Sequence, residues 1–433
     1  MIKQICVATV LLYVCGAGLA QGILFEHGDF ASVCAKAKKE NKLIFIDFYT
    51  SWCGPCKRMR ETVFMQDNVG KYFNDNFVNY KIDAEKGEGK DIAAKYHIQY
   101  YPTYFFIDSK GAVFNKAIGF CPDTVFLGYA GKAQQEFVDP SSLPRLRAQY
   151  AAKKKDTAYL RLYINKLVAA SLHAFDLVEQ YLSIQTAMRA DSHEMMEFIC
   201  HCRAEVYYGG KAALLLEKYG QQYNAMADSL QRTKLAYAKL MISYNTRDYA
   251  IETKSETLLK RYIAGAEKLP PAQRPYLSKE GIWLQFYSAT GNWVRYQPLA
   301  NRWLDSISSG LKLIGPPADS REYLRAQSPE VIAMRRAALL VSDNAKIYRD
   351  HFPGEKEVVK KALRWVKASL TVINNNSSAL TFYANLLYED NDTANAISAK
   401  IKALNSLPQV SLHRDIVQTN LAHMQKGEPL DEE

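Results

Sequence analysis

Two cysteines separated by two residues are the strongest chemical signal in the sequence. Cys53 and Cys56 enclose Gly54 and Pro55, and Trp52 precedes them. Thiols at this spacing can form a disulfide, or they can supply half of a zinc site that needs two further ligands. The chain has no second Cys-x-x-Cys and no histidine pair at ligand spacing. The pair is therefore better interpreted as a redox dithiol than as a metal site, and we expect no metal.

The elements around this pair predict which thiol reacts first. Residues 42–50 form a nearly continuous β-prone run, as expected of a buried strand, and a helix is predicted over residues 54–65. Backbone N–H groups at the start of a helix favour negative charge, so the pKa of Cys53 should be depressed. Cys53 would then attack a disulfide, and Cys56, one turn inside the helix, would resolve the mixed disulfide. Pro55 suits a first helical turn, where its missing N–H is not needed.

The alternation of strands and helices continues over residues 21–140, which we predict to be one domain. Further strands are predicted over residues 78–83, 103–108 and 112–118. Helices are predicted over residues 30–41, 69–73 and 90–96, and from about residue 123. The pattern is typical of a small α/β domain with a mixed sheet.

This region resembles the thioredoxin family over about residues 23–138, on the Cys-Gly-Pro-Cys motif and four further features. Asp47 lies six residues before Cys53, where the family carries a buried acid that handles the proton of the resolving cysteine. Lys57 follows the motif, as in thioredoxin. Tyr101-Pro102-Thr103 precedes the fourth family strand, where a cis-proline packs against the disulfide. Gly119 closes the last strand, where family members leave room for substrate backbone.

The resemblance implies a role for each of these residues. The catalytic set is Cys53, Cys56 and Asp47, with Cys53 and Cys56 forming the redox-active disulfide. The substrate-binding set is Trp52, Gly54, Pro55, Tyr101, Pro102, Thr103 and Gly119. No cofactor is implied, because the dithiol itself carries the electrons.

The residues around Asp47 support its assignment as a proton shuttle. Its neighbours Ile46 and Phe48 are apolar, so the carboxyl should be buried and its pKa raised. Thioredoxin pairs its buried acid with a lysine on the neighbouring strand. Lys81 is the nearest candidate here, and the sequence leaves that pairing open.

From residue 145 to residue 428 the sequence changes to successive amphipathic helices. Examples are predicted over residues 160–170, 175–190, 194–207 and 229–244. Near the end, one unit resembles a tetratricopeptide repeat: small residues Ala384, Ala396 and Ala403 stand where paired helices approach closely, and Pro408 closes the unit. We therefore predict an all-α, tetratricopeptide-like domain of helical hairpins or a solenoid.

The other cysteines that follow residue 20 have less specific interpretations. Cys34 is predicted to lie in the core. Cys121 follows Gly119 by two residues, so it is either a thiol near the redox face or a loop thiol. Cys200 and Cys202 point in different directions on a predicted helix, which disfavours a disulfide or joint metal binding.

The first twenty residues are predicted to be a cleaved signal peptide. Lys3 precedes the apolar run 5–14, and Gly18 and Ala20 are the small residues expected before a cleavage site. We expect the protein in the periplasm or secreted, where dithiols can be oxidised. A net charge of +10 on 433 residues is too small to imply a nucleic-acid partner.

The sequence thus predicts a secreted or periplasmic thiol-disulfide oxidoreductase. The Gly-Pro dipeptide resembles that of reducing thioredoxins, so we expect reduction of protein or peptide disulfides, fed by a membrane electron donor. One alternative is a thiol oxidase or isomerase of folding envelope proteins. Another is a binding scaffold, in which the helical domain binds a peptide or an envelope protein and the redox domain regulates it.

Overall fold

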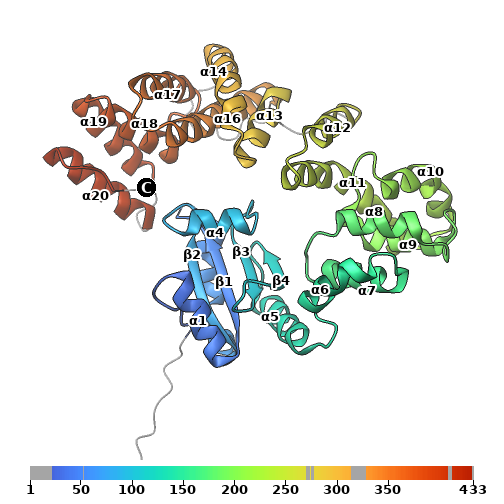
Figure 1. Ribbon diagram of the computed structural model, residues 1–433. Helices are drawn as coiled ribbons and strands as arrows, with labels where there is room; N and C mark the ends of the chain where they lie inside the picture. Colours follow the sequence, from blue (N-terminus) through green and yellow to red (C-terminus); the bar gives the residue numbers. More distant parts are fainter. Residues whose placement is uncertain are drawn as a thin grey trace, which may run out of the picture. The chain divides into compact units, whose positions relative to one another are not determined.

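The computed structural model describes most of the chain, which divides into two compact units (Figure 1). The described residues are 22–51, 53–269, 274, 277–313, 328–407 and 412–431. The first unit extends to Leu177 and the second begins at Val178. The predicted signal peptide, Trp52 and Pro408 lie outside the described residues.

The first unit is built on a four-stranded mixed sheet. Its strands are β1 (Leu43–Tyr49), β2 (Phe77–Asp83), β3 (Thr103–Ile107) and β4 (Val113–Ile118), in the order β2-β1-β3-β4. β1 is parallel to β2 and antiparallel to β3, and β4 is antiparallel to β3. The side chains of β1 are buried on both faces, which explains why its sequence is apolar at nearly every position. The predicted α/β fold with a mixed sheet is confirmed.

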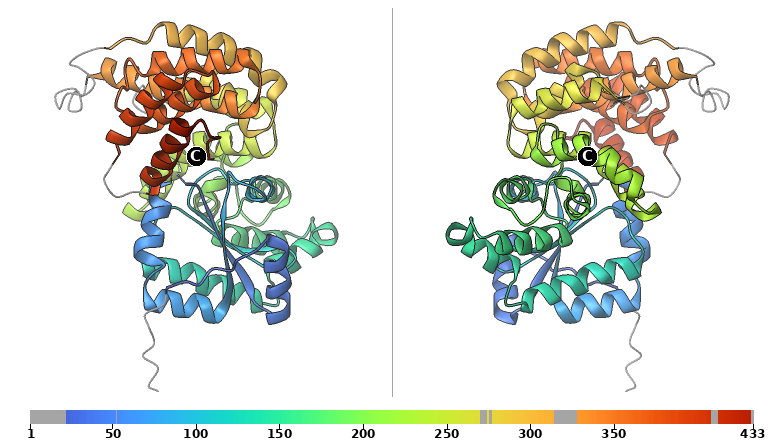
Figure 2. Two further views of the ribbon diagram at one scale, coloured as in Figure 1. Left: turned by 90° about the vertical axis from the view of Figure 1, so that its left-hand side faces the viewer. Right: turned by 90° about the vertical axis from the view of Figure 1, so that its right-hand side faces the viewer.

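Helices lie on both sides of this sheet (Figure 2). They are α1 (Phe30–Glu40), α2 (Gly54–Arg58), α3 (Asp67–Asn76), α4 (Gly89–Lys95) and α5 (Asp123–Val138). Residues of α1 and α4 pack with Ile44 and Ile46 of β1. Residues of α3 and α5 pack with Phe45, on the opposite face. Asp47 shares the face of Phe45, because alternate residues of a strand point to the same side.

The helix after the motif differs from the one predicted. The predicted single helix over residues 54–65 is the short α2 followed by a π-helical turn, Met59–Val63. The Phe64 N–H donates to the Met59 carbonyl at 2.9 Å, five residues back, and the Thr62 hydroxyl donates to the Arg58 carbonyl at 2.7 Å. Met59 and Val63, at the two ends of this turn, both belong to the core cluster around Phe45. Such turns occur frequently at functional sites.

Two helices that the sequence placed after the α/β domain belong to the first compact unit. They are α6 (Leu143–Lys153) and α7 (Thr157–Ala169). The Lys116 N–H of β4 donates to the Ala170 carbonyl at 3.1 Å. The Lys166 ammonium of α7 lies 2.6 Å from Glu136 and 2.7 Å from Asp139, at the end of α5. These contacts connect α7 to both the sheet and α5.

The second unit is helical in all of its described secondary structure apart from one 3-10 turn, as predicted for this region. Its helices begin with α9 (His193–His201), α10 (Lys211–Met226), α11 (Ser229–Glu252), α12 (Glu256–Glu267), α13 (Lys279–Ala289) and α14 (Trp293–Ser309). They continue with α16 (Pro329–His351), α17 (Lys356–Ser369), α18 (Ser377–Glu389), α19 (Thr393–Asn405) and α20 (Leu412–Lys426). Helix α8 (Phe175–Ile184) spans the boundary between the units. Among the described helices, none is both long and apolar enough for a membrane span.

The helix ends in this region were predicted less well than the helices themselves. The helix predicted over residues 175–190 ends at Ile184, because the Gln185 side chain binds the Met188 N–H at 2.9 Å and holds a turn there. The helix predicted over residues 194–207 ends at His201. The Asn245 side chain donates to the carbonyls of Arg203 and Val206, at 2.8 and 2.9 Å, which replaces helical hydrogen bonding there. Local sequence does not reveal this contact from α11.

Helices α18 and α19 form the hairpin in which the sequence resembles a tetratricopeptide repeat. Ala384, Ala396 and Ala403 are fully buried where the two helices meet. Asn391 in the connecting turn has a positive φ of 66°. The small residues therefore allow the close packing on which the resemblance was based, while the repeat assignment itself stays a prediction.

We expect Ala396→Leu to lower the free energy of unfolding by about 1–3 kcal/mol, because three extra carbons must enter a filled contact. The matched control is Ala394→Leu, an exposed alanine on the same helix, for which little change is expected. Urea denaturation of the full chain measures both. Equal midpoints for the two variants would show that the hairpin contact is not close-packed.

Candidate active site

The redox pair lies at the junction of β1 and α2. Cys53 is the N-cap residue of α2, and its sulfur accepts a hydrogen bond from the Cys56 N–H at 3.1 Å. The two cysteines form a disulfide with their Cα atoms 5.3 Å apart, and both side chains are buried. Gly54 and Pro55 between them are exposed. An N–H group of the helix start thus already points at the sulfur of Cys53, where it favours a thiolate.

Asp47 is a buried acid on the strand that leads to this pair. Its side chain lies on the face of the sheet that also contacts Met59 of the π-helical turn. Burial raises its pKa to about 7, although the charges of Arg60 and Lys81 oppose the shift. Its Oδ1 atom has no hydrogen-bond partner among the described residues. Asp47 can therefore bind and release a proton near neutral pH.

Lys81 lies directly opposite Asp47 in the register of β1 and β2. The lysine is exposed, and its ammonium lies 5.6 Å from the centre of the Phe25 ring. The sequence left open whether these two residues pair. In the structure, Lys81 acts on Asp47 through its charge, and it is a weaker influence than Arg60.

Tyr104 lies opposite Asp47 on the other neighbouring strand, β3. Its side chain is fully buried, and its hydroxyl has no hydrogen-bond partner within the described part of the chain. Burial and the charge of Asp47 raise the pKa of Tyr104, so it stays protonated. The surroundings of Asp47 are therefore poorly solvated, which is the physical cause of its raised pKa.

Four of the residues assigned to substrate binding come together at the start of β3. The Tyr101–Pro102 peptide bond is cis, and the Pro102 carbonyl accepts a hydrogen bond from the Gly119 N–H at 2.8 Å. Thr103 pairs with Phe48, so this loop lies at the same end of the sheet as the redox pair. Gly119 has a φ of +83°, which a residue with a side chain adopts only at a cost.

One contact beside this loop was not predicted from the sequence. The Arg58 guanidinium at the end of α2 lies 4.0 Å from the centre of the Phe120 ring. Phe120 directly follows Gly119, so the contact joins α2 to the segment that follows β4. The residues are 62 positions apart, and no local pattern in the sequence indicates that they meet.

The other cysteines are buried to different degrees. Cys121 is a core thiol of the cluster under α5, where burial raises its pKa to about 11. Cys34 is half-buried on α1. Cys200 and Cys202 are fully buried, and burial raises the pKa of Cys200 to about 11. Within the described ranges, no three His, Cys, Asp or Glu side chains are placed to hold a metal ion together.

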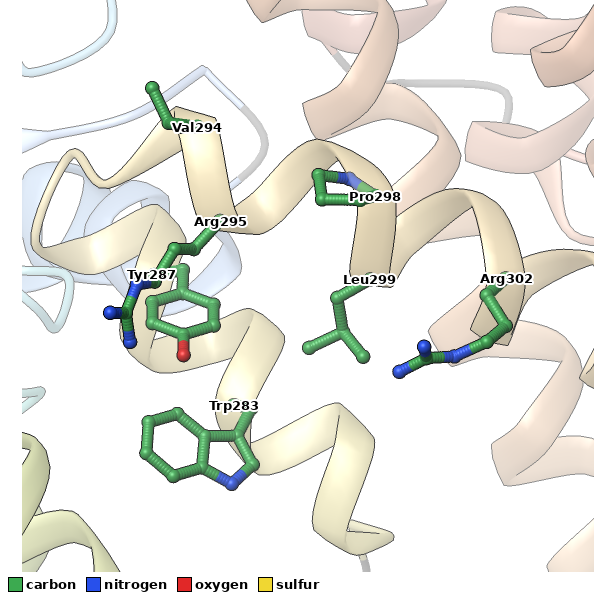
Figure 3. A pocket seen from close by; sticks show the side chains of 7 residues that line it. All are labelled: Trp283, Tyr287, Val294, Arg295, Pro298, Leu299 and Arg302. Carbon is green, nitrogen blue, oxygen red and sulfur yellow. The ribbon is translucent and has the colours of Figure 1, made fainter.

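The second unit contains a shallow groove between α13 and α14 (Figure 3). Its lining combines aromatic, aliphatic and cationic side chains: Trp283, Tyr287, Val294, Arg295, Pro298, Leu299 and Arg302. Arg295 is ion-paired with Glu256 at 2.5 Å. Arg302 is exposed, and it has no acidic partner among the described residues.

Comparisons with known proteins agree with this geometry. A family model described as a thioredoxin-like domain matches residues 30–134. Thioredoxin H4 of Arabidopsis thaliana is 38% identical over 84 residues, which cover 19% of this chain and 66% of that protein. Thioredoxin H-type of Oryza sativa subsp. indica is 38% identical over 91 residues, which cover 21% of this chain and 69% of that protein. The chain belongs to the thioredoxin family.

One solved structure is also similar in sequence. It is a putative disulphide-isomerase from Bacteroides thetaiotaomicron, 40% identical, and the match covers 27% of this chain and 96% of that one, with a TM-score of 0.26. The chain spans just under two thirds of the length of Thioredoxin H4. These matches cover about a quarter of this chain or less, so they describe only part of the protein.

The raised pKa of Asp47 predicts a pH-dependent stability. The folded state holds this proton up to about pH 7, whereas an unfolded Asp loses it near pH 4. Between these values the folded state binds more protons, so stability falls as the pH rises. We expect Asp47→Asn to raise the free energy of unfolding by about 2–4 kcal/mol at pH 8 and to have little effect at pH 4.

Urea denaturation of the oxidised full chain at pH 4 and pH 8 measures this difference. Asp91→Asn is the control, because Asp91 is exposed on α4. A gain for Asp47→Asn that is the same at both pH values would contradict the assignment of a buried, high-pKa carboxyl.

Proposed function

We propose that the protein is a thiol-disulfide oxidoreductase that acts on protein or peptide disulfides. The observation that carries the proposal is the Cys53–Cys56 disulfide at the start of α2, on the same side of the sheet as the buried acid Asp47. A thiol pair needs two things for exchange: a stabilised thiolate and a base for the second proton. The helix start supplies the first and Asp47 the second.

In the proposed reaction, the Cys53 thiolate of the reduced protein attacks a substrate disulfide R–S–S–R′. A Cys53–S–S–R bond forms, the S–S bond of the substrate breaks, and R′–S⁻ leaves and takes a proton. Asp47 then accepts the proton of the Cys56 thiol. The Cys56 thiolate attacks the sulfur of Cys53, which releases R–S⁻ and leaves the Cys53–Cys56 disulfide. Two electrons pass from the dithiol to the substrate, and no cofactor takes part.

The substrate-binding roles follow from the exposed elements around the pair. Gly54 and Pro55 are exposed beside the disulfide, and Trp52 precedes it in the sequence. The backbone of Tyr101, Pro102 and Thr103, with Gly119, would lie along an extended substrate segment. The open space beside Gly119 supports this assignment.

We further propose that the direction is reduction and that the protein works in the periplasm or after secretion. The Gly-Pro dipeptide between the cysteines and the predicted signal peptide over residues 1–20 support this proposal. A dithiol donor would return two electrons per cycle, and outside the cytosol a membrane protein is the expected donor. Oxidation or isomerisation of folding envelope proteins is the alternative.

The helical unit would bind a partner or select substrates. The groove between α13 and α14 supports this role, because it combines an aromatic surface with the exposed cation Arg302, which has no acidic partner among the described residues (Figure 3). In the scaffold alternative, an envelope protein binds here and the redox pair only regulates the complex.

We expect Cys53→Ser to reduce dithiothreitol-driven reduction of a disulfide peptide to the background rate, because the attacking thiolate is gone. Cys56→Ser should accumulate a covalent mixed disulfide at Cys53, detectable by mass spectrometry. Cys34→Ser is the control, and it should keep the wild-type rate. Full activity of Cys53→Ser would exclude the proposed enzyme, and binding of partners without mixed disulfides would favour the scaffold.

The reduction potential of the Cys53–Cys56 pair tests the direction. We expect a value near that of thioredoxin, roughly −270 mV, by equilibration of the mature protein with a thiol-disulfide buffer. A value near roughly −120 mV would indicate an oxidant instead.

A further inference from the structure

Arg58 and Phe120 form a fixed cationic surface beside the redox pair. The guanidinium of Arg58 lies 4.0 Å from the centre of the Phe120 ring. Arg58 is exposed and stands two residues after Cys56, on the same short helix. Phe120 is half-buried and follows Gly119, whose N–H binds the Pro102 carbonyl at 2.8 Å. The charge is therefore held between the two elements that flank the proposed substrate path.

The cation of Arg58 has no acidic partner within the described part of the chain. Lys57 and Arg60 on the same segment add to the positive charge, and Glu61 lies 3.7 Å from Lys57. Stacking on an aromatic ring occupies the face of a guanidinium but leaves its N–H groups available at the edge. Those N–H groups match the two oxygens of a carboxylate.

Two exposed hydrophobic side chains lie beside the loop at this end of the sheet, where the charges of Glu85 and Asp83 also act on Tyr101. Ile118 directly precedes Gly119 and is 47% exposed, and Tyr100 precedes the cis peptide and is 44% exposed. A substrate segment lying there would cover these side chains and lower the local dielectric, which strengthens any charge pair with Arg58.

We propose that Arg58 is a specificity-determining residue that selects disulfide substrates with an Asp or Glu next to the disulfide-bonded cysteine. The inference rests on the proposed thiol-disulfide exchange at Cys53. The Phe120 ring positions the guanidinium before the substrate arrives, so less side-chain entropy is lost when the ion pair forms. Exposed ion pairs are weak, so the expected advantage over a neutral neighbour is about two- to fivefold in rate.

The test uses three disulfide peptides that differ only in the residue before the cysteine: Glu, Gln or Lys. The reduced full-length protein is mixed with each peptide, the reaction is quenched with acid, and the second-order rate constant is measured by chromatography. The wild type should react with the Glu peptide about tenfold faster than with the Lys peptide at low ionic strength. This ratio should approach one in about 1 M salt, because exposed charges are screened.

Variants of Arg58 separate recognition from a structural effect. Arg58→Gln should lower the Glu-to-Lys ratio to about threefold or less, and Arg58→Glu should invert it, while the Gln peptide keeps its rate within about twofold. The control is Lys38→Glu, which makes the same charge change as Arg58→Glu. Lys38 is an exposed residue of α1, which packs on the other face of the sheet, so the ratio should not change.

Three outcomes would overturn the inference. One is a Glu-to-Lys rate ratio in Arg58→Glu that equals the wild-type ratio. Another is an equal loss of rate for all three peptides in the Arg58 variants, which would mean that the Arg58–Phe120 contact has only a structural role. The third is a Glu-to-Lys rate ratio near one for the wild type at low ionic strength, a result that does not depend on whether any variant folds. Failure of the proposed function is distinguishable, because the wild type would then reduce none of the peptides.

Discussion

The position of β1 at the centre of the sheet is the constraint on which the redox site depends. This strand is paired on both edges and covered on both faces, so its register is fixed by the core. It ends at Tyr49, four residues before Cys53, and therefore determines where α2 begins. A shift of one residue would move Asp47 to the other face of the sheet and away from the side on which α2 lies.

The same strand carries Asp47, a residue that lowers the stability of the folded state. A carboxyl among apolar side chains destabilises the folded state once it is ionised. The raised pKa of Asp47, about 7, reflects this loss of stability. Arg60 and Lys81 offset only part of it, because neither forms a direct ion pair with Asp47. An Asn of the same size would fold more easily but could not accept a proton. The residue is thus better explained by proton transfer than by stability.

The sequence predicted the parts of this site that depend on local pattern. The apolar run of β1, the cysteine spacing and the Pro102 loop can each be recognised within a few residues, and the alternation of strands and helices indicated the mixed sheet. Several of the missed features depend on contacts between distant segments. Arg58 meets Phe120 from 62 positions away, and Tyr104 faces Asp47 only through the register of β1 and β3. The helix that ends at His201 stops where Asn245 binds the carbonyls of Arg203 and Val206, just beyond it.

The helical unit supplies no group to the proposed thiol-disulfide exchange. Every group in the proposed proton and electron transfers lies between Asp47 and Gly119, within the first unit. The second unit therefore needs to supply no reacting atom, and recognition is the contribution that we propose for it. Its cationic groove and the cationic surface at Arg58 have the same sign, although they lie in different units.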